Sequence, residues 1–114
     1  MVQRFEVGPR ISEMAVHGNT VYLAGQIARD DSQDIRGQTS QVLASIDALL
    51  ARVGSDKSKI LMAQIFLADL RDFAVMNEVW DAWVVPGQTP PRATVLAGMI
   101  KPEWKIEIVV TAAL

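Results

Sequence analysis

The stretch from Ile60 to Ala68 constrains the fold more than any other part of the chain, because it is apolar at nearly every position and Gln64 is the exception. A strand with one face in water alternates between apolar and polar residues, whereas this stretch is continuous. Strands that are covered on both faces have this pattern and lie inside a sheet. We therefore predict a central β-strand over Ile60 to Ala68, with protein on both of its faces.

A helical pattern precedes this strand. The apolar residues that recur at helical spacing are Ile35, Val42, Ile46, Leu49, Leu50 and Val53. Asp34 is suited to cap the start of the helix, although Gly37 weakens the first turn and favours a start nearer Gln38. Gly54 is suited to the end of the helix.

A second helical pattern follows the central strand. Asp69 or Asp72 can cap its start, and Pro86-Gly87 ends it. Its apolar stripe consists of Phe73, Met76, Trp80 and Trp83.

Shorter apolar runs near the N-terminus predict further strands. Val2 to Glu6 is predicted as an edge strand that ends before Gly8-Pro9. Met14 to His17 and Val21 to Ala24 are separated by Gly18-Asn19, which is typical of a β-hairpin.

The last two strands, Arg92 to Ala97 and Lys105 to Ala113, are predicted to pair as an antiparallel hairpin. The element order is then β-β-β-α-β-α-β-β, which predicts an α+β fold with two helices packed on one face of the sheet. The helices leave the other face of the central strand bare. Self-association through that face, or closure of sheets into a ring or barrel, would cover it.

Composition excludes several classes of function. We place one domain over residues 1–114, of which half are hydrophobic. The net charge is −2, from 11 basic and 13 acidic residues, so we expect no nucleic-acid partner. No apolar stretch approaches the ~20 residues that span a bilayer, and Arg4 and Glu6 interrupt any apolar leader. We therefore expect no membrane association, and a cytoplasmic location.

Cysteine and histidine usage narrows the chemistry further. The chain has no cysteine, which excludes disulfides, thiolate metal sites and thiol nucleophiles. Its one histidine, His17, lies beside a predicted turn, where solvent exposure is more common than proton transfer. We find no phosphate-binding loop and no metal-ligand spacing, so no metal site is predicted.

Arg92 and Glu107 are the two charged residues that stand out in the predicted C-terminal strands. A guanidinium in an apolar strand is costly unless it meets an anion. In the predicted hairpin the two residues would lie opposite or diagonal to each other, and a structural ion pair is then one interpretation. The other is a polar site, in which Arg92 binds a substrate carboxylate and Glu107 holds or activates a water molecule.

Two further residues, Gly25 and Asn77, have two interpretations each. Gly25 ends a strand, where it either forms a turn or allows close approach of a backbone or ligand. Asn77 lies within the apolar stripe of the second helix, where it hydrogen-bonds a neighbouring loop or a ligand. Trp80 and Trp83 are most simply core or interface residues.

Several segments resemble the reactive intermediate deaminase family (RidA), also called YjgF/YER057c/UK114. Val21-Tyr22-Leu23-Ala24-Gly25-Gln26-Ile27 is similar to the SGQ-I strand end of that family. The resemblance continues in the same order through Gln38-Thr39-Ser40-Gln41-Val42-Leu43, Asp69-Leu70-Arg71-Asp72-Phe73-Ala74-Val75-Met76-Asn77, Pro91-Arg92-Ala93-Thr94-Val95 and Lys105-Ile106-Glu107-Ile108. It covers nearly the whole chain, and the deviating N-terminus is typical of a divergent branch.

The resemblance implies a chorismate-mutase-like α+β fold that assembles as a homotrimer, with the sheets in a central barrel and the helices outside. In the family, three clefts lie between adjacent subunits. The arginine that matches Arg92 binds the substrate carboxylate, the glutamate that matches Glu107 helps to position a water molecule, and the glycine that matches Gly25 lines the cleft.

The resemblance also implies an activity. The family hydrolyses enamines and imines that pyridoxal-phosphate enzymes release, such as 2-aminoacrylate and its imine tautomer, to 2-keto acids and ammonia. No cofactor is needed, because an imine is already electrophilic. Other members are credited with ligand-binding, chaperone-like or translation-related roles, so a non-catalytic trimeric ligand-binding or regulatory protein is the alternative. A hydrolase or isomerase of another small carboxylate is a third possibility.

Two departures from the family pattern concern substrate choice. Where members often have Gly-Pro-Tyr-Ser, with the tyrosine in the cleft, this chain has Gly8-Pro9-Arg10-Ile11-Ser12, and we expect Arg10 to make the site more cationic. Where a cysteine commonly follows the arginine by two positions, this chain has Thr94. We expect Arg10, Asn77 and Thr94 to join Arg92 and Gly25 in binding the substrate.

Overall fold

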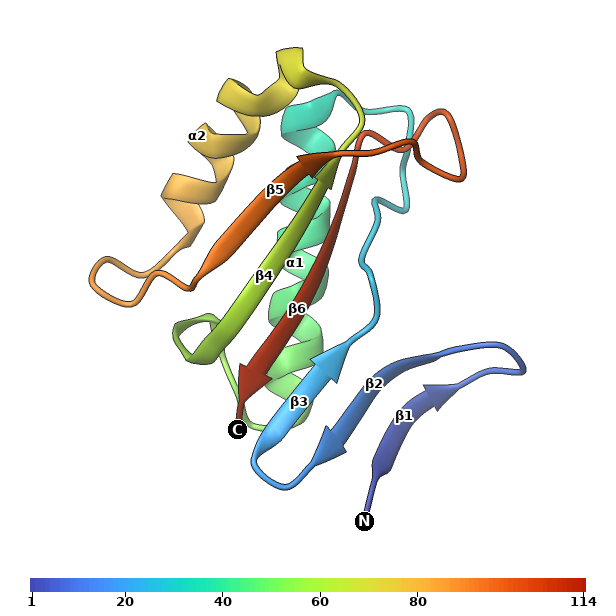
Figure 1. Ribbon diagram of the computed structural model, residues 1–114, viewed down its shortest axis with the longest axis vertical. Helices are drawn as coiled ribbons and strands as arrows, with labels where there is room; N and C mark the ends of the chain where they lie inside the picture. Colours follow the sequence, from blue (N-terminus) through green and yellow to red (C-terminus); the bar gives the residue numbers. More distant parts are fainter.

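The protein, described here over residues 1–114 by a computed structural model, is built on one mixed sheet of six strands in the order β1-β2-β3-β6-β4-β5 (Figure 1). The strands are β1 (Gln3–Val7), β2 (Ser12–His17), β3 (Thr20–Leu23), β4 (Ile60–Leu67), β5 (Arg92–Leu96) and β6 (Ile106–Ala113). β4 lies between β5 and β6, so the predicted interior strand is confirmed.

The predicted C-terminal hairpin is wrong. β5 pairs with β4 in parallel and β6 pairs with the opposite edge of β4 antiparallel, so β4 separates the two strands. The β4, α2 and β5 segments form a crossover unit, and a strand that follows such a helix runs parallel to the first strand. The N-terminal hairpin is confirmed, with His17 opposite Thr20 across the turn.

α1 (Ile35–Arg52) begins where its capping residue predicts. The Asp34 carboxylate accepts a hydrogen bond from the Gly37 backbone N–H, and Gly37 does not delay the helix to Gln38. Gly54 follows the helix at φ +75°, a conformation that glycine adopts without steric cost.

Asp69 and Asp72, the two candidate caps, both precede α2 (Phe73–Trp83), but they have different roles. The Asp69 carboxylate caps a short 3₁₀ turn, Leu70–Asp72, by accepting from the Arg71 N–H. Asp72 then precedes α2 without a capping side-chain hydrogen bond. A second 3₁₀ turn, Lys57–Lys59, leads into β4.

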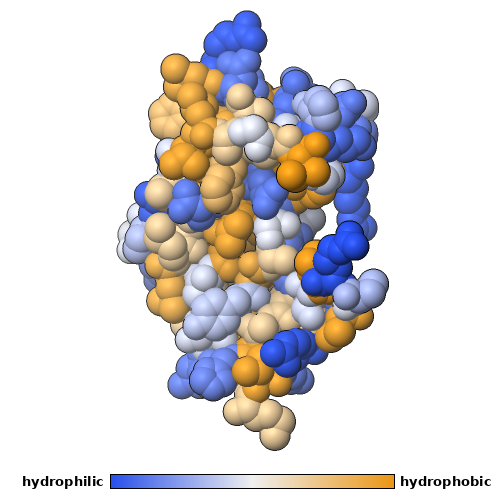
Figure 2. Space-filling model, turned by 45° about the vertical axis from the view of Figure 1, so that its right-hand side comes forward, coloured by the Kyte–Doolittle hydropathy of each residue, from blue (hydrophilic) through white to orange (hydrophobic).

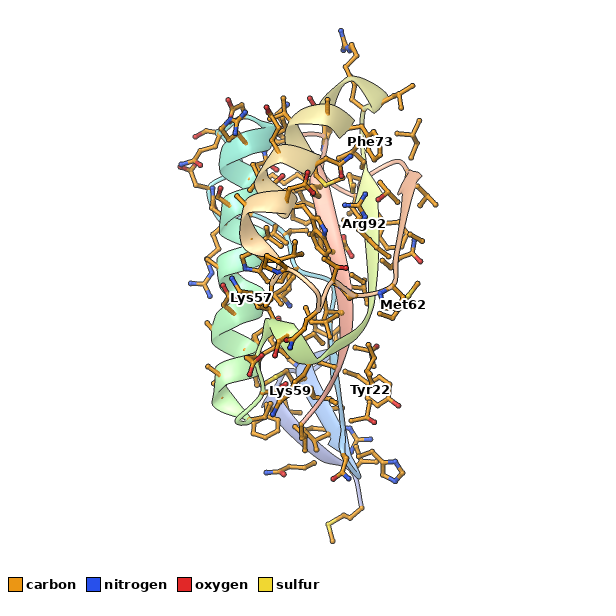
Figure 3. The ribbon with its side chains drawn as sticks, turned by 90° about the vertical axis from the view of Figure 1, so that its left-hand side faces the viewer. Tyr22, Lys57, Lys59, Met62, Phe73 and Arg92 are labelled. Atoms are coloured by element: carbon orange, nitrogen blue, oxygen red, sulfur yellow. The ribbon has the colours of Figure 1, made fainter.

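Both helices cover the same face of the sheet (Figure 3), as predicted. Alternate residues of β6 point into this layer and are fully buried or nearly so: Ile106, Ile108, Val110 and Ala112. They join a core that α1 supplies with Val42, Leu43, Ile46 and Leu50 and α2 with Met76 and Trp80.

The opposite face of the sheet carries no covering element within the chain. In the edge-on view of Figure 3, Tyr22 and Met62 project from this side, and their exposed fractions are 50% and 39%. Apolar residues in orange lie between polar residues in blue over this part of the surface (Figure 2). No helix combines the length and apolar character needed to cross a membrane.

Candidate functional site

Arg92 lies on the helix-facing side of edge strand β5. Its partner across the parallel ladder is Ala63, which is fully buried under the helices. The guanidinium carbon lies 5.2 Å from the ring centre of Trp80 on α2 (Figure 3). The side chain makes no hydrogen bond and no ion pair, so its N–H donors are free. A half-buried guanidinium without an anionic partner is a group that a ligand carboxylate would satisfy.

Two orphaned polar atoms lie on the two elements that supply Trp80 and Arg92, α2 and β5. The side-chain oxygen of Asn77 and the hydroxyl of Thr94 are buried without any hydrogen-bond partner. Thr94 shares the helix-facing side of β5 with Arg92, because strand residues two apart point the same way. Asn77 lies one turn before Trp80 on α2, and α2 runs opposite to β5 (Figure 1). Buried polar groups rarely lack partners, and two of them beside a free cation indicate a place for a ligand.

Glu107 and Gly25 form a second cluster. Glu107 lies on the open side of β6, because its neighbours Ile106 and Ile108 point into the core. Its carboxylate occupies the space beside Gly25, where an added β-carbon would collide with it. Gln26 then pairs with Ile108 through two backbone hydrogen bonds of 2.8 and 3.1 Å. Gly25 therefore serves close approach rather than a simple turn, and the Glu107 carboxylate is what approaches it.

The structure does not bring Arg92 and Glu107 together within one chain. β4 lies between their strands, and the two side chains point to opposite faces of the sheet. The expected opposite or diagonal pairing, and the structural ion pair that it allowed, are both excluded. The cause is the misassigned hairpin: strands that are close in sequence flank β4 instead of pairing.

The remaining predicted residues lie at the far edge of the sheet. Arg10 is exposed in the bend between β1 and β2, at the opposite end of the strand order from β5. His17 is exposed beside the β2–β3 turn, as expected. Within one chain, both residues lie away from β5, and Arg10 forms no ion pair with Glu107.

A cavity of about 810 Å³ lies apart from Arg92. It separates α1 from the N-terminal strands, and its charged residues are Glu6, Glu13, Arg29 and Arg52. Gly25 lines it, and buried Gln26 donates to Glu13 at 3.0 Å. The cavity therefore adjoins Gly25 and not Arg92.

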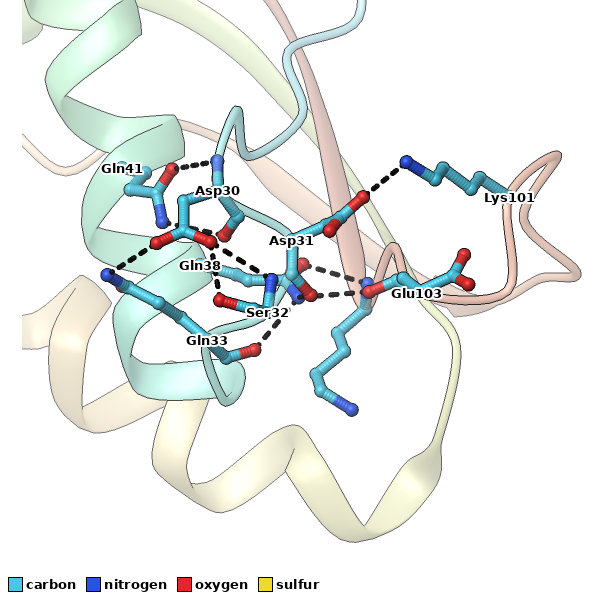
Figure 4. A network of polar contacts seen from close by, with 9 residues as sticks. Asp30, Asp31, Ser32, Gln33, Gln38, Gln41, Lys101 and Glu103 are labelled. Carbon is cyan, nitrogen blue, oxygen red and sulfur yellow. Dashed lines mark hydrogen bonds and ion pairs between the residues drawn. The ribbon is translucent and has the colours of Figure 1, made fainter.

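The sequence offered no role for Gln38, which organises the loops around the start of α1 (Figure 4). This side chain is fully buried. Its amide group donates to the backbone oxygens of Asp31, Gln33 and Glu103, and its oxygen accepts from the Lys105 N–H at 3.0 Å. All polar atoms of this side chain are satisfied, so we assign it a structural role.

The ionisable groups with shifted pKa values lie outside both clusters. Hydrogen bonds from Arg71 lower the pKa of Asp69 to about 2. The hydrogen bond with Asp31, at 2.5 Å, raises the pKa of Lys101. No group of three or more His, Asp or Glu side chains is arranged to hold a metal ion.

Comparisons with known proteins agree with this architecture. The family model for endoribonuclease L-PSP matches residues 2–114. A RutC family protein of Haemophilus ducreyi is 47% identical over 114 residues, which cover 100% of this chain and 97% of that protein. The RutC family protein YoaB of Escherichia coli K12 is 47% identical over 112 residues, covering 98% of this chain and 97% of YoaB.

Solved structures show the same fold. A crystal structure from Pseudomonas aeruginosa is 50% identical and superimposes with a TM-score of 0.97 over 99% of this chain and 98% of that one. RidA from an Antarctic Psychrobacter is 28% identical, with a TM-score of 0.86 over 97% of this chain and 94% of RidA. The chain therefore belongs to the endoribonuclease L-PSP family, the group that includes the RutC, YjgF and RidA proteins.

Proposed function

We propose that this protein hydrolyses reactive 2-imino and enamine acids, such as 2-iminopropanoate and 2-aminoacrylate, to 2-keto acids and ammonia. The observation that carries the proposal is the free Arg92 guanidinium, together with the orphaned atoms of Thr94 on the same strand and of Asn77 on the helix that carries Trp80. A small carboxylate would satisfy Arg92 with paired hydrogen bonds. An imine N–H could donate to the Asn77 oxygen, and Thr94 could donate to or accept from the same ligand.

The reaction asks little of the protein beyond orientation. Water adds to the carbon of the C=N bond, the nitrogen takes up a proton, and collapse of the carbinolamine releases ammonia and leaves the keto acid. We assign Glu107 to hold and deprotonate that water. Arg92 fixes the substrate so that the water meets the imine carbon. The proposal involves no cofactor, and it places the protein in the cytoplasm, where it would remove reactive imines.

We further propose that the complete site forms between copies of the chain in a homotrimer. Arg92 and Glu107 point to opposite faces of one sheet, so a substrate that touches both needs two chains. The open face of the sheet, where Met62 and Val95 are exposed, gives each chain an apolar surface for the others. A central barrel of three sheets would cover this face.

Imine hydrolysis is the first test. An amino-acid oxidase generates imino acids from a panel of amino acids, and semicarbazide traps what remains. We expect less trapped imine with the wild-type protein and a return to baseline with Arg92→Ala. A trapped fraction that the wild-type protein leaves unchanged across the panel would contradict the deaminase.

Mixed oligomers test where the site forms. Arg92→Ala and Glu107→Gln chains carrying different tags are co-expressed, and oligomers that hold both tags are isolated. If Arg92 and Glu107 act from different chains of a trimer, one intact site remains, or about one third of the wild-type activity. If one chain supplies both residues, the mixed oligomers are as inactive as each parent.

A non-catalytic ligand-binding protein is the second candidate, because Arg92 and Thr94 share one face of β5 within a single chain and Glu107 does not join them. Tight binding of 2-oxobutanoate without turnover of any imine would favour it. We give no weight to a ribonuclease activity, since a net charge of −2 offers little attraction for phosphates.

Arg10 is proposed to tune which anion is preferred. In an oligomer, the exposed bend that carries it can reach the cleft of a neighbouring chain. Arg10→Tyr should therefore change the relative rates across the imino acids. Unchanged relative rates would remove Arg10 from the site.

A further inference from the structure

Two tryptophans one turn apart on α2 each have a different cation over the ring. The Arg92 guanidinium lies 5.2 Å from the ring centre of Trp80, and the Lys57 ammonium lies 5.3 Å from the ring centre of Trp83. Trp80 is 5% exposed, so it cannot swing away from the layer between α2 and β5. The two pairs are alike in residue type and distance, but Trp83 is less buried than Trp80, and it is Trp80 that lies beneath Arg92.

Stacking on a ring orients a guanidinium without using its donors. The N–H bonds of arginine lie in the plane of the group, and an aromatic face contacts that plane from one side. A carboxylate partner from the protein would instead occupy the N–H edge. Because Arg92 has the ring and no such partner, its edge remains free for a ligand.

Trp80 is itself held in place by its neighbours. Its ring packs on Trp83 with centroids 5.4 Å apart and planes inclined by 49°. The Trp83 indole N–H in turn donates to Asp47 on α1 at 2.9 Å. The ring beneath Arg92 is thus fixed by both helices, and a fixed ring lowers the freedom that Arg92 loses on binding.

We propose that Trp80 is a positioning residue for Arg92, holding its guanidinium flat with the N–H edge open to the carboxylate of the substrate. This role rests on the proposed function and extends it to a residue that need not touch the carboxylate itself. It predicts that Trp80 acts on carboxylate binding rather than on the addition of water.

The experiment compares Trp80 with Trp83. Trp80→Phe, Trp80→Leu, Trp83→Phe and Trp83→Leu are assayed for 2-oxobutanoate binding by calorimetry and for KM and kcat in imine hydrolysis. We expect Trp80→Leu to raise the dissociation constant and KM about tenfold with a smaller effect on kcat, and Trp80→Phe to recover most of that loss. Because Trp83 supports the Trp80 ring without lying beneath Arg92, its variants should weaken binding less than the matching Trp80 variants do. If a leucine variant fails to fold, Trp80→Met and Trp83→Met replace the leucine pair, since methionine also lacks an aromatic ring.

A signal that does not depend on turnover accompanies these assays. The Nε–H resonance of Arg92 should be shifted by the Trp80 ring current, and it should lose that shift in Trp80→Leu but keep it in Trp83→Leu. Equal binding by wild type and both Trp80 variants would overturn the role of Trp80 alone. If the Trp83 variants weaken 2-oxobutanoate binding as much as the Trp80 variants do, the effect is one of general packing, and the positioning role of Trp80 is overturned as well. A wild-type protein that binds no 2-oxobutanoate and hydrolyses no imine would overturn the proposed function and the role of Trp80 with it.

Discussion

The loops around Gln38 and the layer between α2 and β5 both bury polar groups, but they treat them differently. Every polar atom of the Gln38 side chain has a partner, and the network joins three segments of the chain (Figure 4). Around Arg92, the guanidinium is unpaired and the Asn77 and Thr94 oxygens have no partner. A satisfied network stabilises the fold, whereas an unsatisfied one is completed by something outside the chain.

An orphaned hydroxyl alone does not mark a site. Thr39, next to Gln38 on α1, is fully buried and its hydroxyl is also unpaired. The layer between α2 and β5 differs because its two orphans accompany a free charge. A ligand site is therefore indicated by unpaired polar atoms together with an unpaired charge, and not by either alone. Variants of the two regions can test this difference.

The largest expected effect is on stability, from Gln38→Leu. The variant leaves the carbonyls of Asp31, Gln33 and Glu103 and the N–H of Lys105 without their partner, and we expect a loss of about 3–5 kcal/mol in the free energy of unfolding. Urea unfolding measures it. Gln41→Leu is the control, since Gln41 bonds to the more exposed Asp30, and it should cost less than about 1 kcal/mol. An equal loss of unfolding free energy in both variants would show that the Gln38 network stabilises the fold no more than an exposed hydrogen bond does.

Next in size is the effect of Gly25→Ala on turnover. The added β-carbon occupies the space of the Glu107 carboxylate, so Glu107 must move. We expect imine hydrolysis to fall about 10- to 100-fold while 2-oxobutanoate binding at Arg92 changes little. Gly98→Ala is the matched control, because a β-carbon there meets no atom within 4 Å. Wild-type turnover in Gly25→Ala would show that the position of Glu107 is unimportant.

Thr94→Val and Thr39→Val sharpen the difference between the two orphaned hydroxyls. Each replaces an unpaired buried hydroxyl with a methyl group of similar shape, so each should stabilise the chain by up to about 1 kcal/mol. Only Thr94→Val should weaken 2-oxobutanoate binding, by several-fold, because only Thr94 lies beside Arg92. Thermal unfolding and calorimetry measure the two effects. Weaker binding in both variants would mean that the loss is not local to the proposed site.

The sequence predicts the elements of this fold better than it predicts their neighbours. Asp34, Gly18-Asn19 and the run from Ile60 to Ala68 act locally, through a cap, a turn and an apolar pattern, and each is confirmed. Strand order is not local: the placement of β6 against β4 depends on which long-range pairing buries more surface. The predicted pairing of β5 with β6 places Arg92 and Glu107 in one cluster, whereas β4 separates them in the structure.

The site residues also divide into those with a local sequence signal and those that depend on long-range contacts. Arg92 and Glu107 were recognisable because charges in apolar strands are costly wherever the strands lie. The stacking of Arg92 on Trp80 and the contact of Glu107 with Gly25 could not be predicted, because each joins elements that are distant in sequence. Gln38 was missed for a related reason: a glutamine in a helix is common on the surface, and its burial depends on loops that pack over it.

The smallest expected effect concerns Asp69, whose charge is satisfied locally at the start of α2. Hydrogen bonds from Arg71, the shortest of them 2.6 Å, lower its pKa to about 2 from the usual value near 4. Because the pKa is lower in the folded chain, the stabilisation is fully present above about pH 4, declines as the unfolded chain takes up its proton, and is lost below about pH 2. The difference in Tm between wild type and Asp69→Asn should therefore be small at neutral pH and shrink between about pH 4 and 2. Asp72→Asn removes the same charge from the same turn without removing a capping hydrogen bond, so it should lower Tm less. A difference that grows on acidification would show that the Asp69 carboxylate is destabilised, not stabilised, by its surroundings.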